Sequence, residues 1–397
     1  MEASGIGLRK LASFDRRYPA PPMHVGLNLV FLVPGATGGT EIYARELIPE
    51  LVAAAPEVRF TAFVSREGAA ARGAPWGDLI PQVTVPVRAR NRLEWVRGEQ
   101  QLLPRLASQA GVDLVHSLAN TGPAWGRFRR VVTIHDLAYR LLPEAHLGLA
   151  GIGMRVVVPL AARRSQRIIV DAESTRDDLR RLLKVPPAKI DVVPLGIGAR
   201  HRAEPLPEPE LRSRLAAADR PIVLSVVAKR PHKNLMRLLG ALALIPVERR
   251  PLLVLPGYST PHEDELRLHA AELGVAGDVR LLGWVDPAEL EGLYAAAACF
   301  VFPSLYEGFG LPVLEAMTRG VPVACSAFGA LGEVAGDAAL HFDPESEPAI
   351  AAAIERLLVD LGEAERLRAA GRERAAQFSW AATAAGTLGC YERALSG

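Results

Sequence analysis

The residues best suited to chemistry lie in one short stretch, EGFGLPVLE, in which two glutamates bracket a glycine loop. Glu307 begins the stretch and Glu315 ends it eight positions later. Unpaired N–H groups at a glycine loop, followed by a helix N-terminus and its dipole, favour a bound anion. We therefore predict an anion site formed by the backbone of Gly308, Phe309, Gly310 and Leu311.

The two glutamates are predicted to have different surroundings. Glu315 lies about one turn inside the predicted helix, and its neighbours in the sequence are apolar. A buried carboxylate without a partner costs several kcal/mol, roughly, and the vicinal hydroxyls of a ribose would satisfy it. Glu307 lies on the loop, nearer to a reacting group. The alternative is that Glu307 is a turn residue and that Glu315 faces water.

A run of cations in the sequence VVAKRPHKNL is a second candidate. It follows an apolar segment, residues 221–227, and precedes a helical pattern, residues 235–244. Cations at the end of a strand can neutralise a diphosphate leaving group, and stabilising such developing charge is usually a large catalytic effect. A solvated basic turn is the alternative. The side chains concerned are Lys229, Arg230, His232 and Lys233.

Two further features lie in the first half of the chain. His135 and Asp136 end an apolar run and could contact a sugar across a cleft, although a purely structural histidine is the commoner case. The sequence PGATGG, which ends in Gly38 and Gly39, joins an apolar run to a helical pattern, and a plain tight turn is its alternative. It does not match G-x-G-x-x-G, and no acidic residue ends the next apolar run. A nicotinamide oxidoreductase is therefore disfavoured.

The elements that position these residues alternate along the chain. Apolar, often β-branched runs are separated by loops and helical patterns, which predicts an α/β fold with parallel sheets. Ser174, with Asp177 three residues later, predicts a helix N-cap. The predicted strands are residues 24–33, 60–64, 112–116, 131–134, 167–170 and 190–193 in a first series, and 221–227, 252–255, 279–282, 298–302 and 321–325 in a second.

Length and composition favour two domains. A chain of 397 residues exceeds one ordinary core, and a polar, proline-rich segment divides it. Two α/β series imply a cleft between them, where ligands bind beyond the carboxyl ends of the strands. The predicted parts are a disordered leader, 1–22; a first domain, 23–196; a linker, 197–220; a second domain, 221–378; and a C-terminal helix, 379–397, that packs back toward the first domain.

Charge and cysteine content exclude several classes of protein. A net charge of +2 provides no basic field for nucleic acid. Three separated cysteines match neither a metal site nor a disulfide framework, so we expect buried thiols and a reducing, cytoplasmic compartment. No apolar stretch is long enough to span a membrane. The basic leader is expected to be a solvated tail, and its contact with an anionic membrane surface stays open.

The motifs together resemble those of the retaining glycosyltransferases of family 4, which have the GT-B fold. Besides EGFGLPVLE, the chain carries GGTE, HDLAY, DAESTRDDL, VVPLGI, KRPHKNL and LLGWVDPAELEGLY in the order found in that family. The resemblance covers nearly the whole chain from about His24. It implies an α/β fold of two Rossmann-like domains, whose parallel sheets face each other across a cleft.

The resemblance also implies roles for individual residues, with Glu307, His135 and Lys233 as the catalytic ones. Glu307 would lie beside the donor sugar, and Glu315 would hold the ribose. Many relatives have glycine and then arginine where this chain has Val-Ala-Lys, which leaves open whether Lys229 or Arg230 binds the diphosphate with Lys233. The other implied contacts are the nucleobase at Gly283, Trp284 and Val285, sugar and phosphate at Gly308 to Leu311, donor or acceptor at Gly38 and Gly39, and the donor sugar at His135.

The activity implied by the resemblance is transfer of a hexose, with retention, from a nucleotide-diphosphate sugar to a hydroxyl of a saccharide or lipid-linked acceptor. GDP-mannose is our first choice of donor. The leaving diphosphate would help to deprotonate the acceptor, and neither a cofactor nor a metal ion is expected. We expect the protein in the cytoplasm or at the inner face of the membrane. A sugar-nucleotide epimerase of the same fold and a non-catalytic glycan-binding partner subunit stay open as alternatives.

Overall fold

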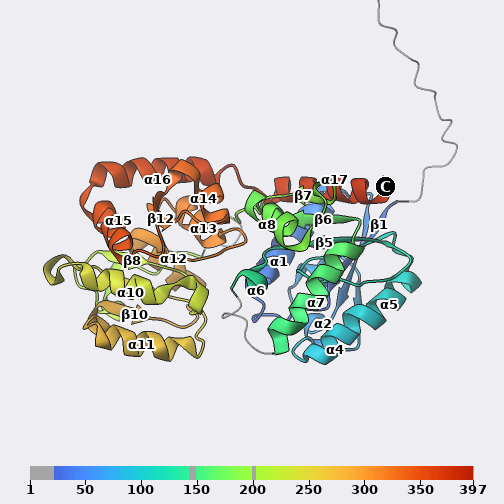
Figure 1. The fold of residues 1–397 in the computed structure, drawn as a ribbon, viewed down its shortest axis with the longest axis horizontal. Coiled ribbons are helices and arrows are strands. Elements are labelled where there is room, and N and C mark those ends of the chain that lie inside the picture. Colours follow the sequence, from blue (N-terminus) through green and yellow to red (C-terminus); the bar gives the residue numbers. More distant parts are fainter. Residues whose placement is uncertain (1–21, 143–148, 199–202, 397) are drawn as a thin grey trace, which may run out of the picture.

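The computed structural model describes residues 22–142, 149–198 and 203–396. Within them the chain forms two α/β domains that lie side by side (Figure 1). Neighbouring strands are parallel throughout both sheets, which confirms the predicted fold class. The predicted leader falls outside the described residues except for its last position.

The first sheet has the strand order β3-β2-β1-β4-β5-β6-β7. Every residue of the interior strand β1 is buried, as expected for a parallel sheet with helices on both faces. The order reverses between β1 and β4, where open α/β sheets bind their ligands. The strands are β1 (His24–Leu29), β2 (Arg59–Val64), β3 (Gln82–Thr84), β4 (Leu114–Ser117), β5 (Arg129–Thr133), β6 (Arg167–Val170) and β7 (Ile190–Val192).

The second sheet repeats this topology, with the order β10-β9-β8-β11-β12-β13. Its reversal point lies between β8 and β11, where Leu224 pairs with Phe300. The loops that follow these two strands are the cation run and the glycine loop, so the fold brings both predicted anion sites to one place. The strands are β8 (Ile222–Leu224), β9 (Leu252–Leu255), β10 (Val279–Leu281), β11 (Ala297–Phe302), β12 (Val323–Ser326) and β13 (Leu340–Phe342).

Helices cover both sheets (Figure 1). In the first domain these are α1 (Gly39–Ala54), α2 (Arg66–Ala69), α3 (Pro75–Asp78), α4 (Arg92–Arg97), a π-helical turn (Gly98–Leu102), α5 (Leu103–Ala110), α6 (Ala138–Leu141), α7 (Leu149–Arg164) and α8 (Glu173–Leu183). After α9 (Glu208–Leu215), the second domain has α10 (Leu235–Leu244), α11 (His262–Glu272), α12 (Pro287–Ala296), α13 (Leu311–Thr318), α14 (Ala330–Ala335), α15 (Glu347–Val359) and α16 (Leu361–Ala375).

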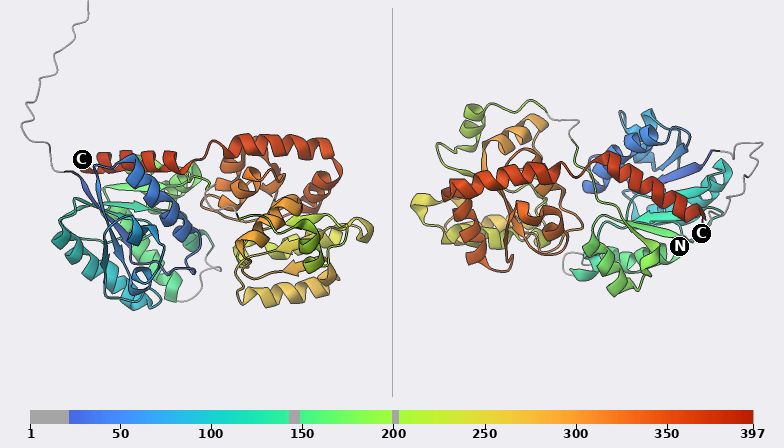
Figure 2. Two further views of the ribbon diagram at one scale, coloured as in Figure 1. Left: turned by 180° about the vertical axis from the view of Figure 1, so that it is seen from behind. Right: turned by 90° about the horizontal axis from the view of Figure 1, so that it is seen from above.

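The last helix, α17 (Trp380–Ser396), lies over the first domain, as the view from above in Figure 2 shows. Tyr391 of this helix bonds through its hydroxyl to Nδ1 of His116, at 2.7 Å. The chain therefore passes twice between the domains, first between β7 and α9 and again between α16 and α17. The passages touch, because the Ile197 N–H donates to the Phe378 carbonyl oxygen at 3.3 Å, and Gly196 packs directly on the backbone of Trp380.

Several local predictions differ from the structure. The strand predicted to run to Val33 ends at Leu29, and the short edge strands β3 and β13 were not predicted. Ser174 does not cap a helix, because α8 already begins at Glu173, after Ala172. The predicted linker contains α9, whose Leu211 and Leu215 are buried, so part of it is folded.

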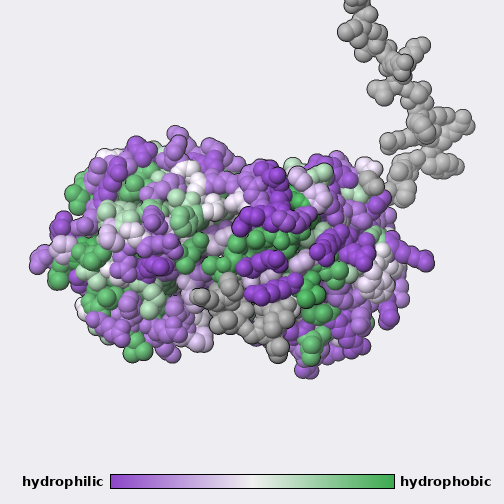
Figure 3. Space-filling view, in the orientation of Figure 1, coloured by the Kyte–Doolittle hydropathy of each residue, from purple (hydrophilic) through white to green (hydrophobic). Residues whose placement is uncertain are grey.

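Other sequence expectations concern burial and membranes. Cys299, Cys325 and Cys390 are buried free thiols. Among the described residues, no helix is both long and apolar enough to cross a membrane. On the face shown in Figure 3, hydrophobic residues lie in small groups between hydrophilic ones.

Candidate active site

The two loops at the reversal point of the second sheet meet through one ion pair. Lys233 ends a 3₁₀ turn, Pro231–Lys233, after β8, and its Nζ lies 2.5 Å from Oε1 of Glu307, after β11. The lysine also lies over the ring of Phe302, 5.5 Å from its centroid. Both charged side chains are partly exposed, at 16% and 14%. The pair therefore offers a cation and a carboxylate to a ligand at the carboxyl edge of the sheet.

The glycine loop leads from Glu307 into α13. Gly310 has φ 109°, in the left-handed region that favours glycine, and it directly precedes the first helical residue, Leu311. Phe309 is buried against Phe378 in an edge-to-face contact, with ring centroids 5.7 Å apart. In the first turn of α13, Pro312 has no N–H and the Val313 N–H donates to the Gly310 carbonyl oxygen at 3.0 Å. The anion site therefore rests on the glycine loop and the Leu311 N–H, and it stays a prediction.

Lys229 lies near this site but has partners of its own. Its side chain is fully buried, and its Nζ donates to the carbonyl oxygens of Gly257, at 2.7 Å, and Leu282. Glu263 lies 3.8 Å from the same nitrogen. Burial lowers the pKa of Lys229 to about 8, although Glu263 opposes that change. Lys229 thus ties together the loops that follow β8, β9 and β10.

Its neighbours in the cation run have other surroundings. Arg230 is exposed, and the half-buried His232 accepts the Leu305 N–H at its carbonyl oxygen, at 2.9 Å. Asn234, which the sequence did not suggest, is buried in a left-handed conformation. Its Nδ2 donates to the carbonyl oxygens of Pro303, at 3.1 Å, and Pro344, at 2.7 Å. Asn234 therefore fixes the cation loop against the loop that carries Glu307.

Glu315, predicted to hold a ribose, lies on α13 with one side-chain donor. The Tyr294 hydroxyl donates to its Oε2 at 3.2 Å. Burial raises the pKa of Glu315, although nearby Arg319 opposes that change. Arg319 is itself paired with Glu291, at 2.9 Å. The carboxyl of Glu315 is thus partly desolvated and accepts one side-chain hydrogen bond, from Tyr294.

The segment predicted to pass the nucleobase follows β10. Trp284 is 73% exposed, and its ring centroid lies 4.8 Å from that of Tyr258. The Gly283 carbonyl oxygen accepts the Gly257 N–H at 3.0 Å, and Val285 packs partly buried against the core. This loop therefore presents an aromatic surface beside the loop that Lys229 holds.

The first domain contributes its own glycine loop. Gly38 has φ 62° and precedes α1, and open space surrounds the position of a side chain at Gly38 and at Gly39. The Tyr258 hydroxyl of the second domain donates to the Gly35 carbonyl oxygen at 3.1 Å. The predicted glycines therefore lie opposite the second domain, with room for a ligand.

His135 lies at the end of β5 and is held at both ring nitrogens. Nδ1 lies 2.7 Å from Oδ2 of Asp171, and Nε2 lies 3.0 Å from the Leu118 carbonyl oxygen. The Leu118 carbonyl oxygen can only accept a hydrogen bond, so Nε2 of His135 carries a proton. Burial disfavours the charged ring, but the Asp171 carboxylate outweighs that effect and raises the pKa of His135. Nε2 is therefore not free to act as a base, and Nδ1 is occupied by Asp171.

Contacts between the domains lie on both sides of Glu307. A Cβ on Gly308 would overlap the His135 carbonyl oxygen. On the other side, Tyr306 accepts the Leu137 N–H at 3.2 Å and donates to Oδ2 of Asp178 at 3.1 Å. Sequence reasoning did not identify Tyr306, and its position beside Glu307 was the only signal.

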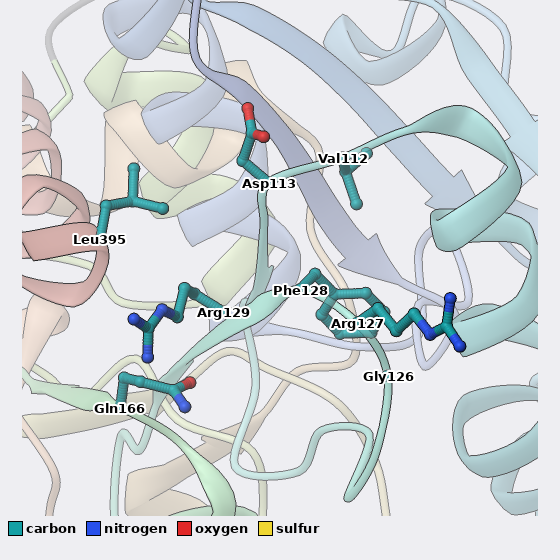
Figure 4. A pocket seen from close by; sticks show the side chains of 8 residues that line it. All are labelled: Val112, Asp113, Gly126, Arg127, Phe128, Arg129, Gln166 and Leu395. Atoms are coloured by element: carbon teal, nitrogen blue, oxygen red, sulfur yellow. The ribbon is translucent and has the colours of Figure 1, made fainter. Parts of the chain in front are cut away.

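A separate pocket lies away from this site. Its volume is about 430 Å³, and it lies at the amino-terminal ends of β4, β5 and β6 (Figure 4). Its polar lining comprises Asp113, Arg127, Arg129 and Gln166. Among the described residues, no group of three or more His, Cys, Asp or Glu side chains could hold a metal ion. The ion pair, not this pocket, therefore remains the candidate centre for chemistry.

Comparison with known families agrees with this geometry. Residues 37–200 match the family described as Glycosyltransferase Family 4, and residues 208–374 match Glycosyl transferases group 1. The chain is 36% identical over 271 residues to an O-antigen chain mannosyltransferase B from Escherichia coli, covering 66% of this chain and 70% of that protein.

Two further likenesses extend this result. An MMP alpha-(1->4)-mannosyltransferase from Mycolicibacterium hassiacum is 34% identical over 239 residues, which cover 59% of this chain and 56% of the relative. Among solved structures, a sucrose-phosphate synthase from Thermosynechococcus elongatus aligns with a TM-score of 0.74 and 25% identity, covering 93% and 98% of the two chains.

Proposed function

Because this chain belongs to the family 4 glycosyltransferases of the GT-B fold and moves a sugar from a nucleotide sugar, we propose that its donor binds over the Lys233–Glu307 pair. The ion pair carries the proposal, because it places a cation for the diphosphate beside a carboxylate for the sugar. The start of α13 supplies further N–H groups for phosphate.

The diphosphate is assigned to Lys233 and Arg230 rather than to Lys229. Lys229 already donates to two carbonyl oxygens and is fully buried, whereas Arg230 is exposed on the same loop. Withdrawing the lysine from those carbonyls would leave buried acceptors unsatisfied, at a cost of about 1–3 kcal/mol each. Lys229 instead shapes the nucleotide pocket.

The ribose and the nucleobase are assigned to residues on the elements next to the diphosphate site. The ribose hydroxyls bond to Glu315, whose pKa is raised by burial and whose carboxyl accepts one side-chain hydrogen bond from Tyr294. The nucleobase lies along Gly283 to Val285, beside the exposed ring of Trp284. Gly38 and Gly39, across the cleft, leave room for the donor or the acceptor.

We propose that transfer retains the configuration at the sugar. The acceptor oxygen forms a bond to the anomeric carbon while the bond from that carbon to the diphosphate breaks, and the acceptor proton passes to the leaving phosphate oxygen. Two observations support a step without a protein base. Both ring nitrogens of His135 already have hydrogen-bond partners, and Glu307 is already paired with Lys233. Charge on the departing diphosphate is then stabilised by cations and by N–H groups.

The donor is proposed to be GDP-mannose and the acceptor a saccharide or lipid-linked saccharide hydroxyl, because two relatives are named as mannosyltransferases and one acts on an O-antigen chain. Such acceptors would place the protein in the cytoplasm, in peripheral contact with the membrane. The test is a thermal-shift panel of nucleotide sugars, because a bound donor raises stability by mass action. We expect GDP-mannose to give the largest shift, and a larger shift with a UDP-sugar would overturn the choice.

Transfer itself is tested with the preferred donor and an acceptor saccharide. Release of free nucleotide only when acceptor is present supports transfer. Isomerisation of the donor alone would point to an epimerase, and donor binding without turnover would point to a non-catalytic partner subunit.

The reaction is proposed to need no metal ion, since Lys233, Arg230 and α13 supply positive charge at the phosphates. We expect EDTA treatment to change the transfer rate by less than about twofold, since charge stabilisation stays with the protein. Loss of activity that added Mg²⁺ or Mn²⁺ restores would contradict this account.

A further inference from the structure

The loop that carries Glu307 is fastened to the first domain by the residue directly before it. Tyr306 is largely buried, and its hydroxyl makes two hydrogen bonds across the domain boundary. The Tyr306 oxygen accepts the N–H of Leu137, which lies two residues after His135. The Tyr306 O–H donates to Asp178 on α8. Burial raises the pKa of Tyr306, so its hydroxyl stays protonated and can donate.

A second side chain of the second domain contacts the N-terminus of α8. The Glu333 carboxylate of α14 accepts the backbone N–H groups of Glu173, at 3.0 Å, and Ser174, at 3.3 Å. The residue preceding the helix, Ala172, has no side chain that could cap it. A carboxylate at a helix N-terminus satisfies unpaired donors and complements the dipole. The second domain therefore supplies a cap that α8 lacks.

Both contacts bear on the catalytic residues. Asp171, which holds the His135 ring, lies between the end of β6 at Val170 and the start of α8 at Glu173. The glycine after Glu307, Gly308, packs on the His135 carbonyl oxygen. Glu307 thus lies between two residues that both touch the first domain, and its position depends on how the domains are closed.

We propose that Tyr306 is a positioning residue that aligns Glu307 with His135 only when the domains close on α8, with Glu333 as the second attachment point. This proposal rests on the proposed function. In the open state Tyr306 would lose both partners, and Glu307 would be aligned by Lys233 alone. Closure of the domains would then itself bring Glu307 into the position needed for transfer.

The first test is Tyr306→Phe, which keeps the ring and removes the hydroxyl. We expect kcat to fall about tenfold, the size expected for losing a hydrogen bond to a charged partner. The affinity for GDP, measured by calorimetry, should stay within about twofold, because the proposed nucleotide contacts lie in the second domain. The matched control is Tyr139→Phe, whose buried hydroxyl has no hydrogen-bond partner in the described structure, and its kcat should not change. An unchanged kcat in Tyr306→Phe would overturn the proposal.

The second test asks whether the hydroxyl acts through α8. In a cycle with Asp178→Ala, the double variant should be no slower than the slower single variant, because residues that share one interaction are not additive. Fully additive losses would contradict a shared role.

The third test does not depend on activity. Small-angle scattering of the ligand-free protein should show a larger radius of gyration for the double variant Tyr306→Phe, Glu333→Gln than for wild type. Equal scattering would reject the attachment of the domains through α8. If wild type turned over no nucleotide sugar but the variants still opened, the attachment would stand and the proposed function would fall.

Discussion

Lys229 and Lys233 stand four positions apart on the loop after β8, yet their ammonium groups have opposite surroundings. That of Lys229 is fully buried and holds two carbonyl oxygens, whereas that of Lys233 is partly exposed beside Glu307. Lys229 joins the loops that follow β8, β9 and β10, whereas Lys233 pairs with Glu307 in the loop that follows β11. In a run of cations, location relative to the strand ends decides which one reaches a ligand.

The largest expected effect is a loss of kcat on replacing Lys233, the more exposed of the two lysines. Lys233→Ala should lower kcat about 10²–10³-fold, because removing one group that stabilises developing charge typically costs that much. The melting temperature should change little, since the side chain is partly exposed. Steady-state transfer and a thermal melt of the same sample make the measurement. Wild-type turnover would show that the diphosphate lies elsewhere.

The next largest effect should come from Gly308→Ala. The added methyl group would overlap the His135 carbonyl oxygen, and backbone atoms cannot move aside cheaply. We expect the domains to be held apart and kcat to fall about 10²-fold, as small misplacements of catalytic groups do. The control is Gly277→Ala, because open space surrounds that position, and its kcat should match wild type. Gly274 is unsuitable as a control, because its φ of 70° would strain an alanine.

The buried end of the loop should respond differently. Lys229→Met keeps the length of the side chain but removes the donor for the Gly257 and Leu282 carbonyl oxygens. We expect the free energy of unfolding to fall by about 2–6 kcal/mol, because two buried carbonyl oxygens lose their donor, and kcat at saturating donor to change less than about threefold. Urea denaturation and steady-state kinetics test this. A loss of kcat as large as in Lys233→Ala would erase the distinction between the two lysines.

The smallest expected effect is on the pH dependence of the free energy of unfolding, through the titration of Lys229. Its pKa is lowered by burial from 10.5 to about 8, so between these values the unfolded chain holds a proton that the folded chain has lost. The free energy of unfolding of wild type should therefore rise with pH across this window, relative to Lys229→Met, by up to about 3 kcal/mol. Urea denaturation of both proteins from pH 7.5 to 10 measures the difference. Parallel pH profiles would show that the lysine is not perturbed.

Periodicity was enough to predict the α/β fold, because buried parallel strands read as apolar runs and the glycine loops follow them directly. It also placed the cation run and EGFGLPVLE at strand ends, and the reversal point between β8 and β11 brought them together. The end of β1 was misplaced, because apolar residues 30–33 continue the strand pattern after the sheet has ended. The edge strands β3 and β13 were missed, whereas the equally short edge strands β7 and β10 were predicted because each ends in an apolar residue and is followed by a further one, Val193 and Leu282.

Partners far apart in sequence could not be predicted. Tyr306 and Asp178 are separated by 128 positions, and Glu333 caps a helix 160 positions earlier. The local capping pattern at Ser174 competed with that distant carboxylate and was the wrong choice. The two lysines likewise look alike in the sequence, because only the ends of β9 and β10 distinguish them.

The two passages of the chain between the domains meet at Gly196, which lies on the backbone of Trp380. Because they touch, both connections between the domains lie at one place. Cutting the backbone in either passage would leave the halves joined by the other, so a single proteolytic nick there would not release a domain. A methyl group on Gly196 would overlap the backbone of Trp380, so Gly196→Ala would force the two passages apart and change how the domains are joined.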